Sequence, residues 1–108
     1  MNGWILLPEG GVRPVELTLE DHVLTAVADD GDRVVAWETS EMAMVQQANK
    51  HRAAHFRAKG DARILAVKAG PTLMTIQAST DHLRTLGHAP SRWPILIKYL
   101  AGATIGAA

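Results

Sequence analysis

The residue pair with the clearest spacing for metal chemistry is His51 and His55. On a helix, residues four positions apart share one face, so that both imidazole rings could bind one metal ion. Arg52 follows the first histidine, at the position where a zinc protease helix carries its general-base glutamate. Two imidazoles are too few ligands for a tight zinc site, and neighbouring cations repel a dication. We therefore predict no metal site, no catalytic residue and no cofactor. A small metal-dependent hydrolase is the third and least favoured function.

A second set of residues has the chemistry to bind nucleic acid. The basic residues of the same segment could contact phosphates, while its glutamines and Asn49 reach base edges. On a helical projection, however, these cations flank an apolar stripe on two sides instead of forming one row. Aromatic residues make up only 5% of the chain, which is too few for a base-stacking platform. A nucleic-acid-binding regulator is thus the alternative function, with the contact residues Lys50, Arg52, Arg57 and Lys59.

Charge is divided unevenly along the chain, although its 11 basic and 11 acidic residues give a net charge of zero. Residues 1–41 hold nine acidic and two basic residues, which gives −7. Residues 42–108 hold nine basic and two acidic residues, which gives +7. A zero net charge argues against a polyanion binder that relies on bulk charge. Two explanations of the asymmetry stay open: the halves complement one another within one fold, or a bipolar surface orients a partner.

The C-terminal residues 93–108 form the longest apolar stretch, and Lys98 is their only charged residue. Sixteen residues are fewer than the roughly 20 that a membrane-spanning helix needs, so we predict no membrane partner. An apolar terminus has to dock, either on the core of its own chain or on a partner. Buried aromatic side chains dominate interface energy. We predict an interface with the anchors Trp93, Ile95, Ile97 and Tyr99 and the polar rim Arg52, His55 and Lys59.

Four strands are expected before residue 39. The apolar run 4–7 ends at a turn rich in proline and glycine. Val15, Leu17 and Leu19 alternate with polar residues, which is typical of a strand buried on one face. Two further apolar runs, 23–27 and 33–37, flank the sequence Asp-Asp-Gly-Asp, which predicts an antiparallel hairpin around Gly31.

The pattern then changes, because residues 39–59 contain neither glycine nor proline but many helix formers. Gly60 follows as a C-terminal stop, so this segment is predicted to be one long helix. Runs 64–67 and 73–76 are expected to pair as a second hairpin, and residues 81–86 to form a short helix. The expected fold is α+β, with a mainly antiparallel sheet of about six strands in the order ββββ-α-ββ-α-tail.

These features lead to one functional prediction. Residues 1–92 are expected to form a single domain, and residues 93–108 its apolar tail. The chain has no cysteine, so redox chemistry does not indicate its compartment. No basic segment precedes its first apolar run, so no signal peptide is predicted and a cytoplasmic location is expected. We predict a small non-catalytic protein-binding module: an inhibitor, an adaptor or an accessory subunit of an assembly. Its partner is another protein or a second copy of the chain, bound through the C-terminal segment.

Overall fold

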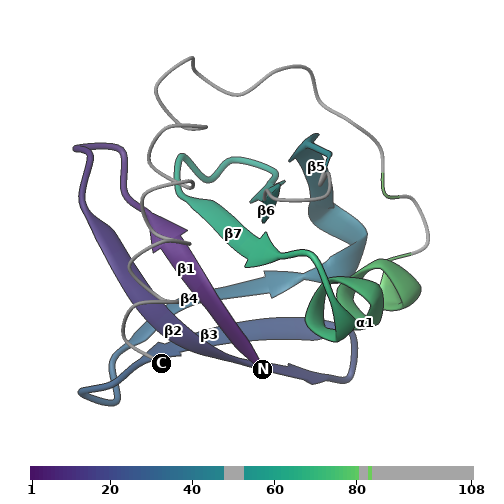
Figure 1. Ribbon diagram of the computed structural model, residues 1–108, viewed down its shortest axis with the longest axis horizontal. Coiled ribbons are helices and arrows are strands. Elements are labelled where there is room, and N and C mark those ends of the chain that lie inside the picture. Colours follow the sequence, from purple (N-terminus) through teal and green to yellow (C-terminus); the bar gives the residue numbers. More distant parts are fainter. Residues whose placement is uncertain (48–52, 81–82, 84–108) are drawn as a thin grey trace.

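The chain forms one curled antiparallel sheet with a short helix beside it, as the computed structural model in Figure 1 shows. The structure describes residues 1–47, 53–80 and 83. The elements are β1 (Asn2–Leu6), β2 (Val12–Glu20), β3 (Val23–Ala28), β4 (Arg33–Glu38), the short 3₁₀ turn η1 (Thr39–Glu41), β5 (Met42–Gln46), β6 (Ala53–Ala58), β7 (Ile64–Lys68) and α1 (Pro71–Ser79).

The seven strands lie in the order β4-β3-β2-β1-β7-β6-β5, and every neighbouring pair is antiparallel. Strands β4 and β5 are therefore the two edges of the sheet, although η1 connects them directly in the chain. The sheet curls into a half-barrel (Figure 1). This order also sorts the charges, because the acidic N-terminal half supplies β1 to β4 and the basic half supplies β5 to β7.

The predicted strands before residue 39 are confirmed. Val15 and Leu17 of β2 point into the core, while the residues that alternate with them along the strand are exposed. The hairpin around Gly31 is confirmed as well, since β3 pairs with β4 and Gly31 has a positive φ of 87°. Asp21 and His22 connect β2 to β3, and both have positive φ, as a type I′ turn requires.

The long helix predicted for residues 39–59 is wrong. The segment forms η1 and then the antiparallel strands β5 and β6, with Met44 opposite Phe56. Strand β5 is buried on both faces, and so is most of β6, so neither shows the polar alternation that marks a half-exposed strand. Tertiary contacts have overridden the helix propensity of alanine and methionine here. Gly60, predicted to end a helix, instead has a positive φ of 78° in the turn between β6 and β7.

The strand predicted for residues 73–76 is also wrong, because this run lies within α1. Strand β7 already pairs with β1 on one side and β6 on the other, so it offers no free edge for a further hairpin partner. Pro71 stands at the start of the helix, where its missing N–H is not needed. Leu73 and Ile76 share one helix face and are buried. The predicted short helix 81–86 lies outside the described residues, apart from Leu83.

Within the described residues, the fold is therefore mostly antiparallel sheet, with seven strands and one short helix, rather than about six strands with one long and one short helix. The main core lies inside the curl. It includes Phe56, Leu24 and Trp37, and α1 adds Leu73 and Ile76 beside the end of β7 (Figure 1). In the part of the chain that the structure describes, no helix has the length and apolar character needed to cross a membrane.

Candidate functional site

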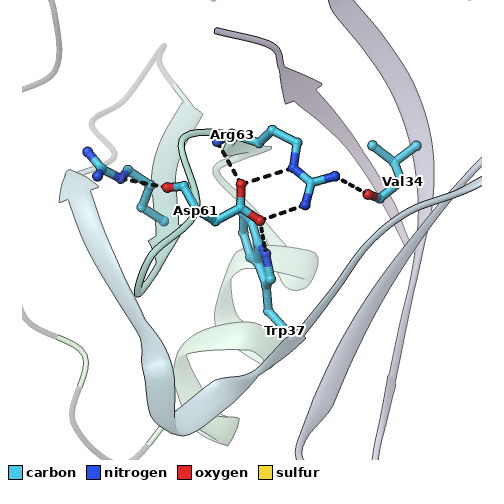
Figure 2. A network of polar contacts seen from close by, with 5 residues as sticks. Val34, Trp37, Asp61 and Arg63 are labelled. Atoms are coloured by element: carbon cyan, nitrogen blue, oxygen red, sulfur yellow. Dashed lines mark hydrogen bonds and ion pairs between the residues drawn. The ribbon is translucent and has the colours of Figure 1, made fainter.

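A network of polar contacts centres on Asp61, in the turn between β6 and β7 (Figure 2). Its carboxylate accepts hydrogen bonds from Arg63 at both oxygens: from Nε at 2.9 Å and from a terminal nitrogen at 2.7 Å. The backbone N–H of Arg63 and the indole N–H of Trp37 each donate at 2.9 Å. The carboxylate thus accepts four hydrogen bonds, two of which form the planar fork typical of arginine.

The same network joins strands that lie far apart in the sheet. Arg63 also donates to the backbone carbonyl of Val34, and both Val34 and Trp37 belong to the edge strand β4. Arg57 of β6 donates to the backbone carbonyl of Asp61. Figure 2 shows Asp61 and Arg63 reaching from the β6–β7 turn across to β4. These contacts hold the curled sheet together along its open side, and we call them the clasp.

Electrostatics within the clasp favour the ionised pair. Hydrogen bonds from Arg63 and Trp37 hold the pKa of Asp61 well below its usual range, against the opposing effect of burial. The hydrogen bond to Asp61 in turn raises the pKa of Arg63. Both charged groups direct their polar atoms to one another and to Trp37 and Val34. The arrangement therefore serves the fold, because its donors and acceptors are already engaged within the protein.

A second feature is an apolar cluster on the side of the sheet that faces away from the main core. We call it the outer apolar face. Its members come from β1, the start of β2, and β5 to β7, and they alternate along these strands with the side chains of the inner core. They are Trp4, Leu6, Val12, Val45, Ala53, Ile64 and Ala66.

Strand register brings these side chains into adjacent rows. Leu6 lies opposite Val12 on one side and Ile64 on the other. In the next row, Ala66 lies between Trp4 of β1 and His55 of β6. Ile64 and Ala66 are both 0% exposed, although each points away from the main core. The β1 and β5–β7 half of the sheet is therefore apolar and buried on both of its faces.

The corresponding outer surface of β2, β3 and β4 has the opposite character. Glu16, Thr18 and Glu20 of β2 are exposed, as is Glu38 of β4. At the hairpin tip, Arg13 forms ion pairs with Asp30 at 3.4 Å and with Asp32 at 2.9 Å. Shallow open hollows lie along this surface beside β2 and the tip. This half of the sheet has a single apolar face, and its other face is solvated and acidic.

His55 was predicted on a helix, in the polar rim of an interface, but it lies on β6 with only 1% of its surface exposed. Its register places it beside Ala66 on the outer apolar face. Burial lowers the pKa of His55 to about 4, because the charged imidazolium would lose its hydration there. The side chain is therefore neutral at pH 7.

Of the other predicted site residues, the structure describes Arg57 and Lys59. Arg57 and Lys59 are exposed at the end of β6 and in the turn that follows. The remaining members of both predicted sites lie outside the described residues: Lys50, Arg52, Trp93, Ile95, Ile97 and Tyr99. His51 lies outside them too. Within residues 1–47, 53–80 and 83, no group of three or more histidine, aspartate or glutamate side chains has the geometry to hold a metal ion.

Sequence reasoning missed both the clasp and the outer apolar face. The clasp joins residues up to 29 positions apart, and neither Asp61 nor Arg63 shows by its spacing that Val34 and Trp37 lie near it. The outer face did leave a signal. Runs such as Ile64-Leu65-Ala66-Val67 are apolar at every position, which is typical of a strand covered on both sides.

Comparisons with known proteins add no relative. No protein-family model matches the chain, and searches of curated protein sequences and of solved structures return no significant match.

Proposed function

We propose that this chain is a small non-catalytic protein-binding module: an inhibitor, an adaptor or an accessory subunit of a larger assembly. The observation that carries the proposal is the outer apolar face, which lies on the opposite side of the sheet from the main core. An antiparallel sheet with a single core normally leaves its second face polar and solvated. A contiguous apolar cluster on that second face has to be covered, and the layer that fits it is an apolar protein segment.

The chemistry of the face favours an apolar protein segment as its ligand. Alanines at positions 53 and 66 lie among the larger side chains of Trp4, Leu6 and Ile64. Such low positions fit the large side chains of a covering segment, since interfaces pack as densely as protein interiors. Cationic side chains stand at both ends of the face, with Arg57 on β6 and Lys68 on β7. They provide a polar rim around an apolar centre.

The interface residues predicted from the sequence remain part of the proposal. Trp93, Ile95, Ile97 and Tyr99 are the proposed anchors of an apolar segment that binds an outer apolar face, and Arg52, His55 and Lys59 its proposed polar contacts. His55 lies on the outer apolar face itself and is buried there. Its contact with a bound segment would therefore be made within the centre of the interface and not at an exposed rim.

Nucleic-acid binding through Lys50, Arg52, Arg57 and Lys59 is the weaker alternative. Arg57 already donates from Nε to the backbone carbonyl of Asp61, at 3.1 Å. The helix predicted to present these cations to a nucleic-acid groove does not form, since β5 and β6 stand in its place. A nucleic-acid interface would show affinity that falls steeply with salt, whereas binding to the outer apolar face is expected to change little with salt.

A displayed library of random 12-residue peptides, selected against the full chain, tests the proposed function. We expect enriched peptides rich in aromatic and aliphatic residues. Their binding should fall at least tenfold in Trp4→Lys and Val12→Lys, because each places a charge on the partly exposed margin of the outer apolar face. The matched control is Thr18→Lys, which adds the same charge to the exposed outer surface of β2. Amide spectra would verify that each variant is folded.

Two results would contradict the protein-binding function. One is a selection that enriches no peptide above background. The other is a set of peptides whose affinity drops in Thr18→Lys but not in Trp4→Lys or Val12→Lys, which would place the binding surface on the acidic half of the sheet.

A further inference from the structure

The outer apolar face is buried more completely than the sheet alone can explain. Side chains stand roughly perpendicular to a sheet, so those on an uncovered face keep part of their surface in contact with water. Ile64 and Ala66 nevertheless have no exposed surface, and Leu6 retains only 3%. Every described member of the cluster belongs to the sheet itself. A second layer therefore has to lie over this face.

None of the described elements outside the sheet supplies that layer. The helix α1 directs Leu73 and Ile76 into the main core, on the other side. Leu83, which follows the helix, also packs against the main core. The longest stretch beyond the described residues is 84–108, and its last sixteen residues are largely apolar, with Lys98 as their only charged residue. This composition matches what the outer apolar face requires.

We infer that residues 93–108 dock on the outer apolar face of their own chain. The nine residues 84–92 can extend about 30 Å, close to the longest extent of the molecule, 34 Å. This length is enough to carry Trp93 from Leu83 to the outer apolar face. Four neighbouring strands span about 14 Å from the first axis to the last, and sixteen residues cover at least about 24 Å, even as a helix. The segment is long enough to cross the whole face.

Complementary shape and polarity support this occupant. The large side chains Trp93, Ile95 and Ile97 can fill the low positions above Ala53 and Ala66. The side-chain oxygen of Gln46, opposite His55 in the register, is buried without a hydrogen-bond donor among the described residues. The hydroxyl of Tyr99 and the ammonium of Lys98 are donors that a docked segment could supply there.

Docking in cis would regulate the site. A segment tethered to its own binding face acts at an effective concentration of the order of millimolar, so an external protein segment must displace it to bind. Residues 93–108 would then be an internal competitor that weakens binding until a stronger ligand arrives. This regulatory consequence rests on the proposed function, whereas the docking itself does not.

Paramagnetic labelling of the full chain tests the docking. The protein has no cysteine, so Ala101→Cys creates a single site for a nitroxide label. We expect the label to broaden the amide signals of Ala53, His55 and Ala66, and to leave those of Thr18 and Thr25 on the acidic half sharp. The matched control carries the label at Thr18→Cys and should show the reverse pattern. Equal, weak broadening in both halves would overturn the inference.

A mixed sample separates the chain's own segment from that of a second copy. Isotope-labelled chains without the nitroxide are combined with nitroxide-labelled chains without the isotope. Docking in cis predicts no broadening of Ala53 or Ala66 in this mixture. Strong broadening there would show that the segment docks on a neighbouring copy, and would overturn the cis arrangement.

The regulatory consequence has its own readout. Ile95→Ser combined with Ile97→Ser weakens the internal competitor, so the selected 12-residue peptides should bind at least about tenfold more tightly than to the natural chain. Thr104→Ser is the control and should leave that affinity unchanged. An unchanged affinity in the double variant would contradict competition. If selection yields no peptide while the cis broadening persists, the docking stands and the protein-binding function fails.

Discussion

The two halves of the sheet use the same antiparallel architecture for different surroundings. Strands β2 to β4 bury one face and present carboxylates and hydroxyls on the other, as Glu16 and Thr18 show. Strands β5 to β7, together with β1, bury both faces, and Ala66 has no exposed surface on the side away from the core. One half thus needs only water over its outer face, whereas the other needs a second layer.

This difference also explains which strands can be read from the sequence. A strand with one solvent-exposed face alternates polar and apolar residues, whereas a strand that is buried on both faces does not. The clasp then joins the halves, since Asp61 and Arg63 come from the turn between β6 and β7 and bond to Val34 and Trp37 of β4. The comparison between the halves leads to four predictions.

The largest effect is expected when the same charge is placed on the outer surface of each half. Ala66→Asp should lower the free energy of unfolding by roughly 4 kcal/mol, because an unpaired carboxylate would be buried under the covering layer. Thr18→Asp should change it by less than about 1 kcal/mol, because that side chain is exposed. Urea unfolding at pH 7 measures both values. Equal, small losses would show that both outer surfaces are solvated.

The next effect is a pH dependence that originates on the covered half. The pKa of His55 is about 4 in the folded chain and about 6.5 when unfolded, so the unfolded state binds the proton more readily. Stability is therefore full above pH 6.5 and declines as the pH falls toward 4, by about 3 kcal/mol. Urea midpoints at pH 7 and pH 4.5 test this.

His55→Gln supplies the control for this titration, since it carries no ionisable group. Its midpoint should vary much less over the same pH interval. A natural chain whose midpoint is the same at pH 7 and pH 4.5 would show that His55 is hydrated, and that the outer face is open to water.

A smaller effect is expected at the clasp between the halves. Asp61→Asn removes the charge that Arg63 pairs with, and should cost about 2 kcal/mol of unfolding free energy. Because the pKa of Asp61 is depressed in the folded state, the contribution of its charge is present above the unfolded pKa of 3.8 and declines below it. Chemical denaturation at pH 7 measures the loss. Asp29→Asn, at the exposed hairpin tip, should change stability by under about 0.5 kcal/mol.

The smallest effect is expected in the one-sided half, at the turn between β2 and β3. Asp21 and His22 both adopt positive φ there, of 51° and 63°. His22→Gly removes the steric strain of a residue in the left-handed conformation. The substitution should raise the free energy of unfolding by about 1 kcal/mol. Asp29→Gly at the other hairpin is the comparison and should give no gain. Thermal unfolding measures the change in stability of each variant relative to the natural chain. A loss of stability in His22→Gly would contradict the type I′ turn.

Much of the one-sided half could be predicted from local sequence. The alternation of Val15 and Leu17 with polar residues predicted β2, and the glycine at position 31 predicted the β3–β4 hairpin. The two-sided half could not be predicted in the same way. Residues 39–59 contain neither glycine nor proline, and their alanines and methionines favour a helix when considered alone. Nothing local shows that both faces of β5 will be covered.

The candidate site follows the same division. His55 and Lys59 were singled out by type and spacing, but their surroundings came from pairing with strands elsewhere in the chain. Leu6, Val12 and Ile64 meet on the outer apolar face only because β1 lies between β2 and β7. Such neighbours are set by strand order, which single-sequence periodicity does not contain.

The sequence alone determined the first four strands, the hairpin at Gly31 and the separation of acidic from basic halves. It could do so because turn residues and period-two alternation act over a few positions. Tertiary structure decided the rest: that β7 joins β1 to β6, that Asp61 reaches β4, and that one half of the sheet is apolar on both sides. These outcomes depend on which strands become neighbours, and burial on two faces overrides the propensities of the residues that are buried.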